Sequence, residues 1–198
     1  LDGLGIIWFH TSPGTGTEVA MGVWRGNLKE WILTGRSGFM NALEFLAQTL
    51  GLVGLAQRGV HKTAIRVRGD NLSALSWASE RRFRGEASDA TAITQVIGCT
   101  LAQLDVTDAA HLPHRKEYDY NWRCDQLCRG ASWHDILERD AGDPITGPRL
   151  HSKIPRWEIR GSEEILECCR PTREWGGTRE DFTGIIGKAR QWCLSEPR

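Results

Sequence analysis

The chain lacks several features that identify whole classes of protein. Its 25 Lys+Arg residues balance its 25 Asp+Glu residues, so it lacks the basic excess typical of many nucleic-acid-binding domains. It has no apolar run of the roughly 18 residues that a membrane-spanning helix needs. The stretch 1–9 has neither a basic start nor a cleavage site, so no signal peptide is predicted. We therefore expect a globular domain that does not bind a membrane.

The aromatic and cysteine residues indicate how the core is built and in which cellular compartment the protein is expected. There are only 2 Tyr against 9 Trp, spread along the whole chain. Trp can stack on bases, but most of these residues are expected to pack in or over the core. The 6 Cys are irregularly spaced and no secretory feature accompanies them, which indicates reduced thiols in a cytoplasmic or nuclear setting. The first residue is Leu, as expected for a piece of a longer polyprotein.

Hydrophobic periodicity predicts an alternation of strands and helices. Strands are expected at 5–10, 18–24, 28–33, 63–67 and 106–112, and helices at 41–57, 72–79, 88–104 and 120–127. This order predicts an α+β (α/β-like) domain with a mixed five-stranded sheet flanked by helices. A right-handed crossover would pair the fourth strand parallel to the first. We expect this domain to span 1–130 and a C-terminal extension, partly helical or loop-rich, to span 131–198.

Side-chain patterns within these segments predict caps and buried faces. In the helix 41–57, the apolar positions 43, 46, 50, 53 and 55 form the expected core face. In the helix 88–104, Ala90, Ile93, Ile97 and Leu101 share one face. Asp70 or Asn71 is expected to cap the helix that begins at 72.

Three acidic residues stand in three separate elements. Glu44 lies on an apolar helix, Asp70 follows a strand, and Asp125 lies on the last helix of the core. Carboxylates that converge repel one another, so a site that gathers them usually holds a divalent cation. Each has a simpler explanation as well. Glu44 could be a solvated residue at the edge of its face, Asp70 a helix cap, and Asp125 the partner of Arg129 one turn later.

Short motifs in this order carry a resemblance to a known family. They are Ser12-Pro13-Gly14, Glu44, Asp70-Asn71 with Ala74-Leu75, and His111, His114, Asn121, Asp125, Leu127 and Arg129. Over roughly residues 5 to 130, the chain resembles the ribonuclease H domain of retroelement reverse transcriptases.

The resemblance implies a function and a set of site residues. Glu44, Asp70 and Asp125 would hold Mg²⁺ or Mn²⁺, and the reaction would be hydrolysis of RNA in an RNA–DNA hybrid. His114 falls in the loop where the family places a mobile His that aids turnover. Asn71 and Asn121 would contact the substrate. A reverse transcriptase domain is the expected neighbour in the parent polyprotein.

One position departs from the family pattern. Aligning Ser12-Pro13 on the family phrase puts His10 where the first catalytic Asp stands, so His10 takes a metal-ligand position. A neutral imidazole offers one lone pair and no negative charge, and it cannot bridge two hard cations. Glu18, across the predicted hairpin, is a possible substitute. We therefore expect catalysis to be impaired or lost.

Three other interpretations remain open. The first is a catalytically inactive ribonuclease H-like module that binds nucleic acid or braces a neighbouring polymerase domain. The second is a small zinc-binding interaction domain using His111, His114, Cys124 and Cys128, although their spacing matches no common zinc site well. The third is a non-functional relic of a retroelement.

Overall fold

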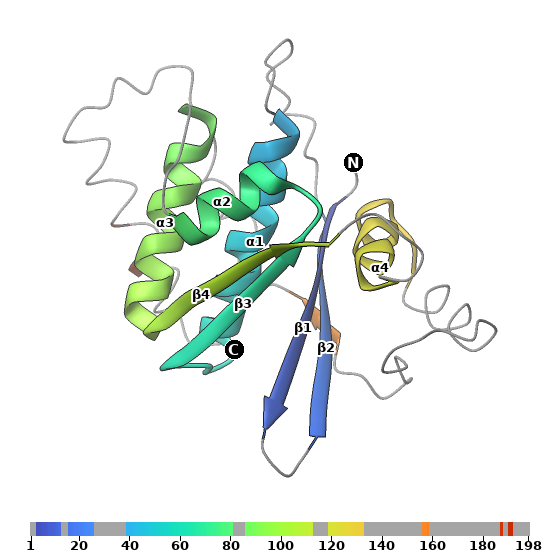
Figure 1. Cartoon of the computed structure of the whole chain (residues 1–198), viewed down its shortest axis with the longest axis horizontal. Coiled ribbons are helices and arrows are strands. Elements are labelled where there is room, and N and C mark those ends of the chain that lie inside the picture. Colours follow the sequence, from blue (N-terminus) through green and yellow to red (C-terminus); the bar gives the residue numbers. More distant parts are fainter. Residues whose placement is uncertain are drawn as a thin grey trace. The chain divides into compact units, whose positions relative to one another are not determined.

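The computed structural model describes residues 3–12, 16–25, 39–80, 86–112, 119–132 and 156–158, and residues 187, 190 and 191. Two compact units can be distinguished (Figure 1). One comprises Leu1–Glu30 and Leu112–Ile159, and the other comprises Trp31–His111 and Arg160–Arg198. No helix among the described residues is long and apolar enough to cross a membrane.

The first unit contains a three-stranded sheet and one helix. Strand β1 (Gly3–Ser12) pairs antiparallel with β2 (Gly16–Arg25), which in turn pairs parallel with the short β5 (Arg156–Glu158). The predicted hairpin is therefore confirmed, whereas the predicted strand 28–33 lies outside the described residues. Strand β5 falls within the stretch expected to be an extension, so that stretch contributes to the first sheet.

Helix α4 (Asp119–Cys128) packs against β1 in this unit. The packing is close at Gly5, where an added Cβ atom would lie 2.5 Å from the carbonyl oxygen of Cys124. It would also lie 2.8 Å from the Cβ atom of Leu127, which is fully buried. Glycine at this position therefore lets the strand and the helix approach each other.

Within the described residues, the second unit consists of a two-stranded parallel sheet and three helices. Strand β3 (Thr63–Gly69) pairs with β4 (Leu104–His111) through the crossover formed by α2 (Leu72–Glu80) and α3 (Glu86–Ala102). Burial alternates along β3, so one face of the strand is covered and the other is exposed. Helix α1 (Phe39–Gln57) packs against both α2 and α3 (Figure 1). The described strands thus form a mixed α/β arrangement in two sheets, and a single five-stranded sheet is not shown.

The core of the second unit lies where the three helices meet. On α1 four of the five predicted core positions are fully or almost fully buried, namely Leu43, Leu46, Leu50 and Val53, whereas Leu55 is half-buried. Phe45 is also buried, and its ring meets Trp77 of α2 edge to face at 5.7 Å between centroids. Trp77 therefore covers the core, as expected for most of the tryptophans.

The buried face of α3 differs from the predicted one. Leu101 keeps 40% of its surface exposed, while Ala92, Gln95 and Ala102 are buried. Helix α3 packs against α1, and Ala92 belongs to the same buried cluster as Phe45 of α1. The predicted face is therefore wrong at Leu101, whereas Ile93 and Ile97 on that face are half-buried.

Candidate metal and nucleic-acid site

The junction between β3 and α2 holds Asp70 and Asn71. Asp70 follows the last residue of β3, and Asn71 immediately precedes α2. The backbone N–H of Ala74 donates to Asn71 Oδ1 at 3.0 Å, and the N–H of Leu75 donates to the Asn71 carbonyl oxygen at 3.0 Å. Asn71 is thus the helix cap, with its side-chain oxygen on the third helical N–H. Of the two cap candidates in the sequence, the structure selects Asn71.

A second hydrogen bond from Asn71 ties this junction to α1. Its amide Nδ2 donates to Asn41 Oδ1 at 2.8 Å, and both side chains are half-buried. Asn41 lies in the first turn of α1, and Glu44 follows three residues later on the same helix. The hydrogen bond therefore joins the segment that carries Glu44 to the segment that carries Asp70.

Glu44 and Asp70 both occupy positions between core and solvent. Glu44 is half-buried between the buried side chains of Leu43 and Phe45, and Asp70 is half-buried beside the cap. Each takes part in a polar or electrostatic interaction within the fold. A half-buried carboxylate needs a cation or hydrogen-bond donors to offset its desolvation.

Asp125 lies on α4, in the first unit, and forms the ion pair expected from its spacing to Arg129. Arg129 Nε donates to Asp125 Oδ1 at 2.9 Å and to Oδ2 at 2.8 Å. The side chain of Arg129 is 70% exposed and that of Asp125 is 33% exposed, so water screens the pair. Asn121 is half-buried one helical turn before Asp125. In the structure, Asp125 is therefore the ion-pair partner of Arg129, and its role in metal binding remains a prediction.

His10 lies near the end of β1, directly opposite Glu18 of β2 in the antiparallel register. Glu18 is thus the carboxylic residue in register with His10, as the predicted hairpin requires. His114 lies outside the described residues.

The zinc interpretation gains no support from the described part of the chain. His111 ends β4 and is exposed, while Cys124 and Cys128 are half-buried on α4 and form no disulfide. No group of three or more His, Cys, Asp or Glu side chains that could hold a metal ion occurs among the described residues.

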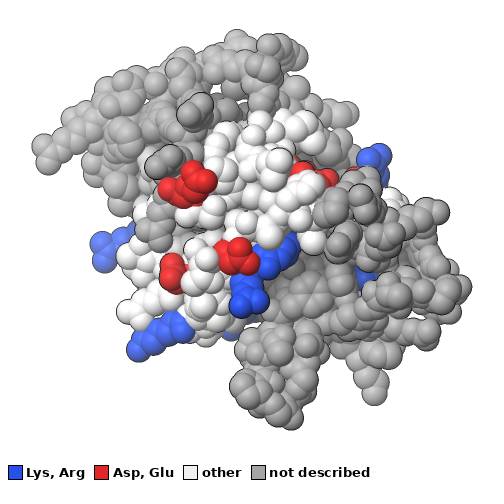
Figure 2. All heavy atoms as spheres, viewed as in Figure 1, with Lys and Arg blue, Asp and Glu red and all other residues white. Residues whose placement is uncertain are grey.

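Charged side chains of the described residues lie interspersed. Arg66 and Arg68 are exposed on β3, and Arg68 Nη2 forms an ion pair with Asp108 Oδ2 of β4 at 2.9 Å. In Figure 2, acidic and basic side chains alternate with neutral ones across the described part of the face in view. The described part of this face therefore shows no broad basic patch.

Two polar residues of the second unit were missed by the sequence patterns. Helix α1 begins at Phe39, and Asn41 in its first turn accepts a hydrogen bond from Asn71. Gln95 is buried on α3, and only its place among short side chains could have indicated this. Asn41 could not be recognised because its partner Asn71 lies 30 residues away in the sequence.

Comparison of the chain with protein-family models, with curated proteins and with solved structures found no match.

Proposed function

We propose that this chain is a ribonuclease H-like domain of a retroelement reverse transcriptase polyprotein, in which metal-dependent hydrolysis of RNA in RNA–DNA hybrids is impaired or lost. The order of elements supports the proposal, since an antiparallel hairpin precedes a helix, a strand, two helices, a strand and a last helix. Glu44, Asp70 and Asp125 fall on the elements that the resemblance assigns to the three acids. A single mixed sheet with β3 beside β1 is part of the proposal.

The observation that carries the proposal is the hydrogen bond between Asn41 and Asn71. It fixes the first turn of α1 against the β3–α2 junction at 2.8 Å. Glu44 and Asp70 lie on the two segments that this bond joins, and the bond involves neither carboxylate. Holding ligands in place before a cation arrives is what a metal site requires of its supporting residues.

The residues present fit Mg²⁺ or Mn²⁺ in part. Carboxylate oxygens are the donors that these hard cations prefer, and the proposal requires Glu44, Asp70 and Asp125 to supply them together, whereas the described residues form no group of three such ligands. A divalent cation bound there would supply an activated water and stabilise the leaving 3′-oxygen. Arg129 occupies both oxygens of Asp125, and because its side chain is 70% exposed it can move away without disturbing the core.

His10 is the reason to expect weak or absent activity. A carboxylate at this position would add one negative charge and four lone-pair sites, whereas imidazole adds one neutral nitrogen. The substrate would be recognised through its backbone and 2′-hydroxyl groups, with Asn71 and Asn121 as contact residues. Because Asn71 already caps α2 and bonds to Asn41, its contribution to substrate binding would come through the backbone it holds.

Cleavage of a labelled RNA–DNA hybrid with Mg²⁺ or Mn²⁺ tests the proposal. We expect little or no cleavage by the chain as given and clear cleavage by His10→Asp. Adding Asp70→Asn to His10→Asp should abolish that gain, whereas His10→Asn should not produce it. A folded His10→Asp variant that leaves the hybrid intact would overturn the catalytic part of the proposal.

A second candidate is an inactive module that binds nucleic acid or braces an adjacent reverse transcriptase domain. The feature that favours it is His10, which stands where the family has its first catalytic Asp. Fluorescence anisotropy with a labelled hybrid, at several salt concentrations, measures such binding directly. Affinity that falls with salt and is unchanged by Asp70→Asn would favour this candidate, because phosphate contacts would then act without the carboxylates.

A further inference from the structure

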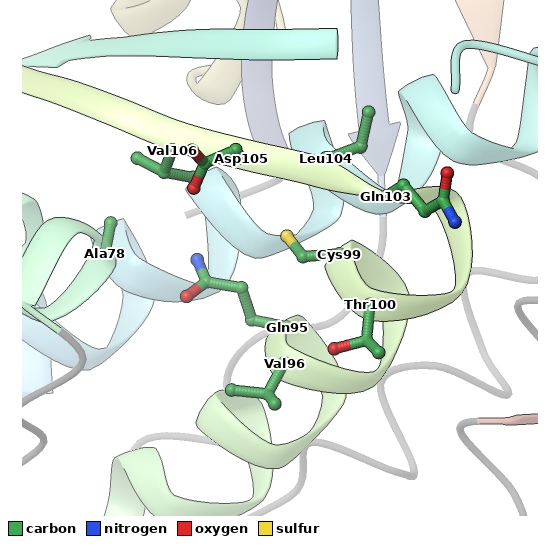
Figure 3. A pocket seen from close by; sticks show the side chains of 9 residues that line it. All are labelled: Ala78, Gln95, Val96, Cys99, Thr100, Gln103, Leu104, Asp105 and Val106. Carbon is green, nitrogen blue, oxygen red and sulfur yellow. The ribbon is translucent and has the colours of Figure 1, made fainter. Parts of the chain in front are cut away.

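A pocket of about 270 Å³ lies between α3 and the first residues of β4 (Figure 3). Its walls come from both elements and from Ala78 of α2. Val96 and Val106 provide apolar surface, while Gln95 and Asp105 provide polar groups. Pockets for drug-sized ligands begin at about 300 Å³, so this one suits a smaller molecule.

Gln95 is the unusual member of this lining. Its side chain is only 3% exposed, and its amide Nε2 is buried without a hydrogen-bond partner among the described residues. A buried donor left in this state costs about 1 to 3 kcal/mol. Figure 3 shows the Gln95 amide turned away from its own helix, toward the side of the pocket where Ala78 and Asp105 lie. The pocket therefore presents a donor that lacks an acceptor.

Asp105 supplies the complementary group. It is exposed on β4, in register with Ala64, and lines the same pocket as Gln95. Its carboxylate accepts hydrogen bonds and, when ionised, donates none. A ligand that satisfies both residues must carry an acceptor for Gln95 and a donor for Asp105.

We propose that this pocket binds a nucleobase, with a ring acceptor on Gln95 Nε2 and an amino donor on the Asp105 carboxylate. A base carries both groups on one edge, and its apolar faces fit between Val96 on the helix and Val106 on the strand. The base can come from a free nucleoside or from an unpaired nucleotide in a strand. The site uses none of the proposed metal ligands, so it stands or falls separately from the proposed function.

Titration with adenosine, followed by the side-chain amide signals in a ¹⁵N-correlated NMR spectrum, tests the proposal. Loss of one signal pair in Gln95→Met assigns the Gln95 amide. We expect adenosine to shift that pair, and Gln95→Met to weaken binding by at least about fivefold. Because Met is of similar size and removes an unpaired donor, its melting temperature should equal or exceed that of the unchanged chain.

Matched variants on β4 test the role of Asp105. Asp105→Asn should weaken adenosine binding, whereas Asp108→Asn should not, because Asp108 pairs with Arg68 and does not line the pocket. Purine riboside, which keeps the ring acceptor but lacks the amino group, should bind more weakly than adenosine and should be insensitive to Asp105→Asn. Equal affinity of the two nucleosides would refute the assigned orientation.

The source of the base is decided by comparing adenosine with a short single-stranded oligoadenylate. Tighter binding of the oligonucleotide indicates a strand, and equal binding per site indicates a free nucleoside. If neither probe shifts the Gln95 amide at millimolar concentration, the proposal is wrong. Asp70→Asn should leave all of these results unchanged.

Discussion

Replacement of Asn71 by Ala should loosen the β3–α2 junction more than loss of a cap alone. The substitution removes the oxygen that accepts from the Ala74 N–H at 3.0 Å and the Nδ2 group that donates to Asn41 at 2.8 Å. Loss of an Asn cap costs about 1 kcal/mol. Loss of the second bond costs about 1 kcal/mol more, because Asn41 Oδ1 is left half-buried. We expect the free energy of unfolding to fall by about 2 kcal/mol.

Two further variants separate these contributions. Asn71→Ser keeps a capping oxygen and loses only the donor to Asn41, so it should lose about half as much stability. Asn41→Ala removes the same bond from the other side. In a double-mutant cycle between positions 41 and 71, the coupling energy should be about 1 kcal/mol.

Hydrogen exchange of the α2 amides, resolved by NMR, measures the effect locally. A loss of 2 kcal/mol corresponds to exchange that is about 30-fold faster where opening limits it. Amides of α4, in the other unit, serve as the internal reference and should not change. Unchanged stability of Asn71→Ser, with no coupling to position 41, would show that the bond between the two asparagines does not stabilise the junction.

Three other substitutions test separate features of the fold. Gly5→Ala should destabilise the first unit by about 1 to 3 kcal/mol, because its Cβ would meet the Cys124 carbonyl; unchanged exchange of the α4 amides would contradict this. Gln103→Gly should raise the melting temperature, since this residue has a φ of 54° and left-handed backbone costs other residues about 1 to 2 kcal/mol; a lower value would refute the strain. Asp125→Asn should change stability by less than about 1 kcal/mol in denaturant unfolding, because its partner Arg129 is exposed; a larger loss would indicate a buried role.

The sequence patterns predicted the local elements well because helices and strands depend on near neighbours. The expected helix 41–57 is observed as Phe39–Gln57, and the expected strand 63–67 as Thr63–Gly69. Strand β5 was not predicted, since its three residues contain no periodicity and are defined only by pairing with β2. The buried face of α3 was mistaken for a similar reason. Which face a helix buries depends on the partner helix, and α1 accepts the short side chains of α3.

In the candidate site, too, some features follow from near neighbours in the sequence and others depend on residues far away in the sequence. The sequence offered Asp70 and Asn71 equally as the cap of α2, and spacing alone could not choose between them. The choice depends on backbone geometry at the end of β3 and on Asn41, which lies 30 residues away in the sequence. The ion pair of Asp125 with Arg129 was predictable because both residues lie on one helix, four positions apart.

These observations have opposite consequences for Asp70 and Asp125 as candidate metal ligands. Asp70 had a structural explanation as a helix cap, and Asn71 takes that role, so the cap no longer accounts for a carboxylate at this position. Asp125 had a structural explanation as the partner of Arg129, and that ion pair is present.

Asp70→Asn is therefore the sharper test of metal binding. It keeps the size of the side chain and leaves the cap intact, and it removes only the charge that a divalent cation would need. If Mn²⁺ binding to His10→Asp, followed by electron paramagnetic resonance, is as tight with Asp70→Asn as without it, Asp70 is not a metal ligand.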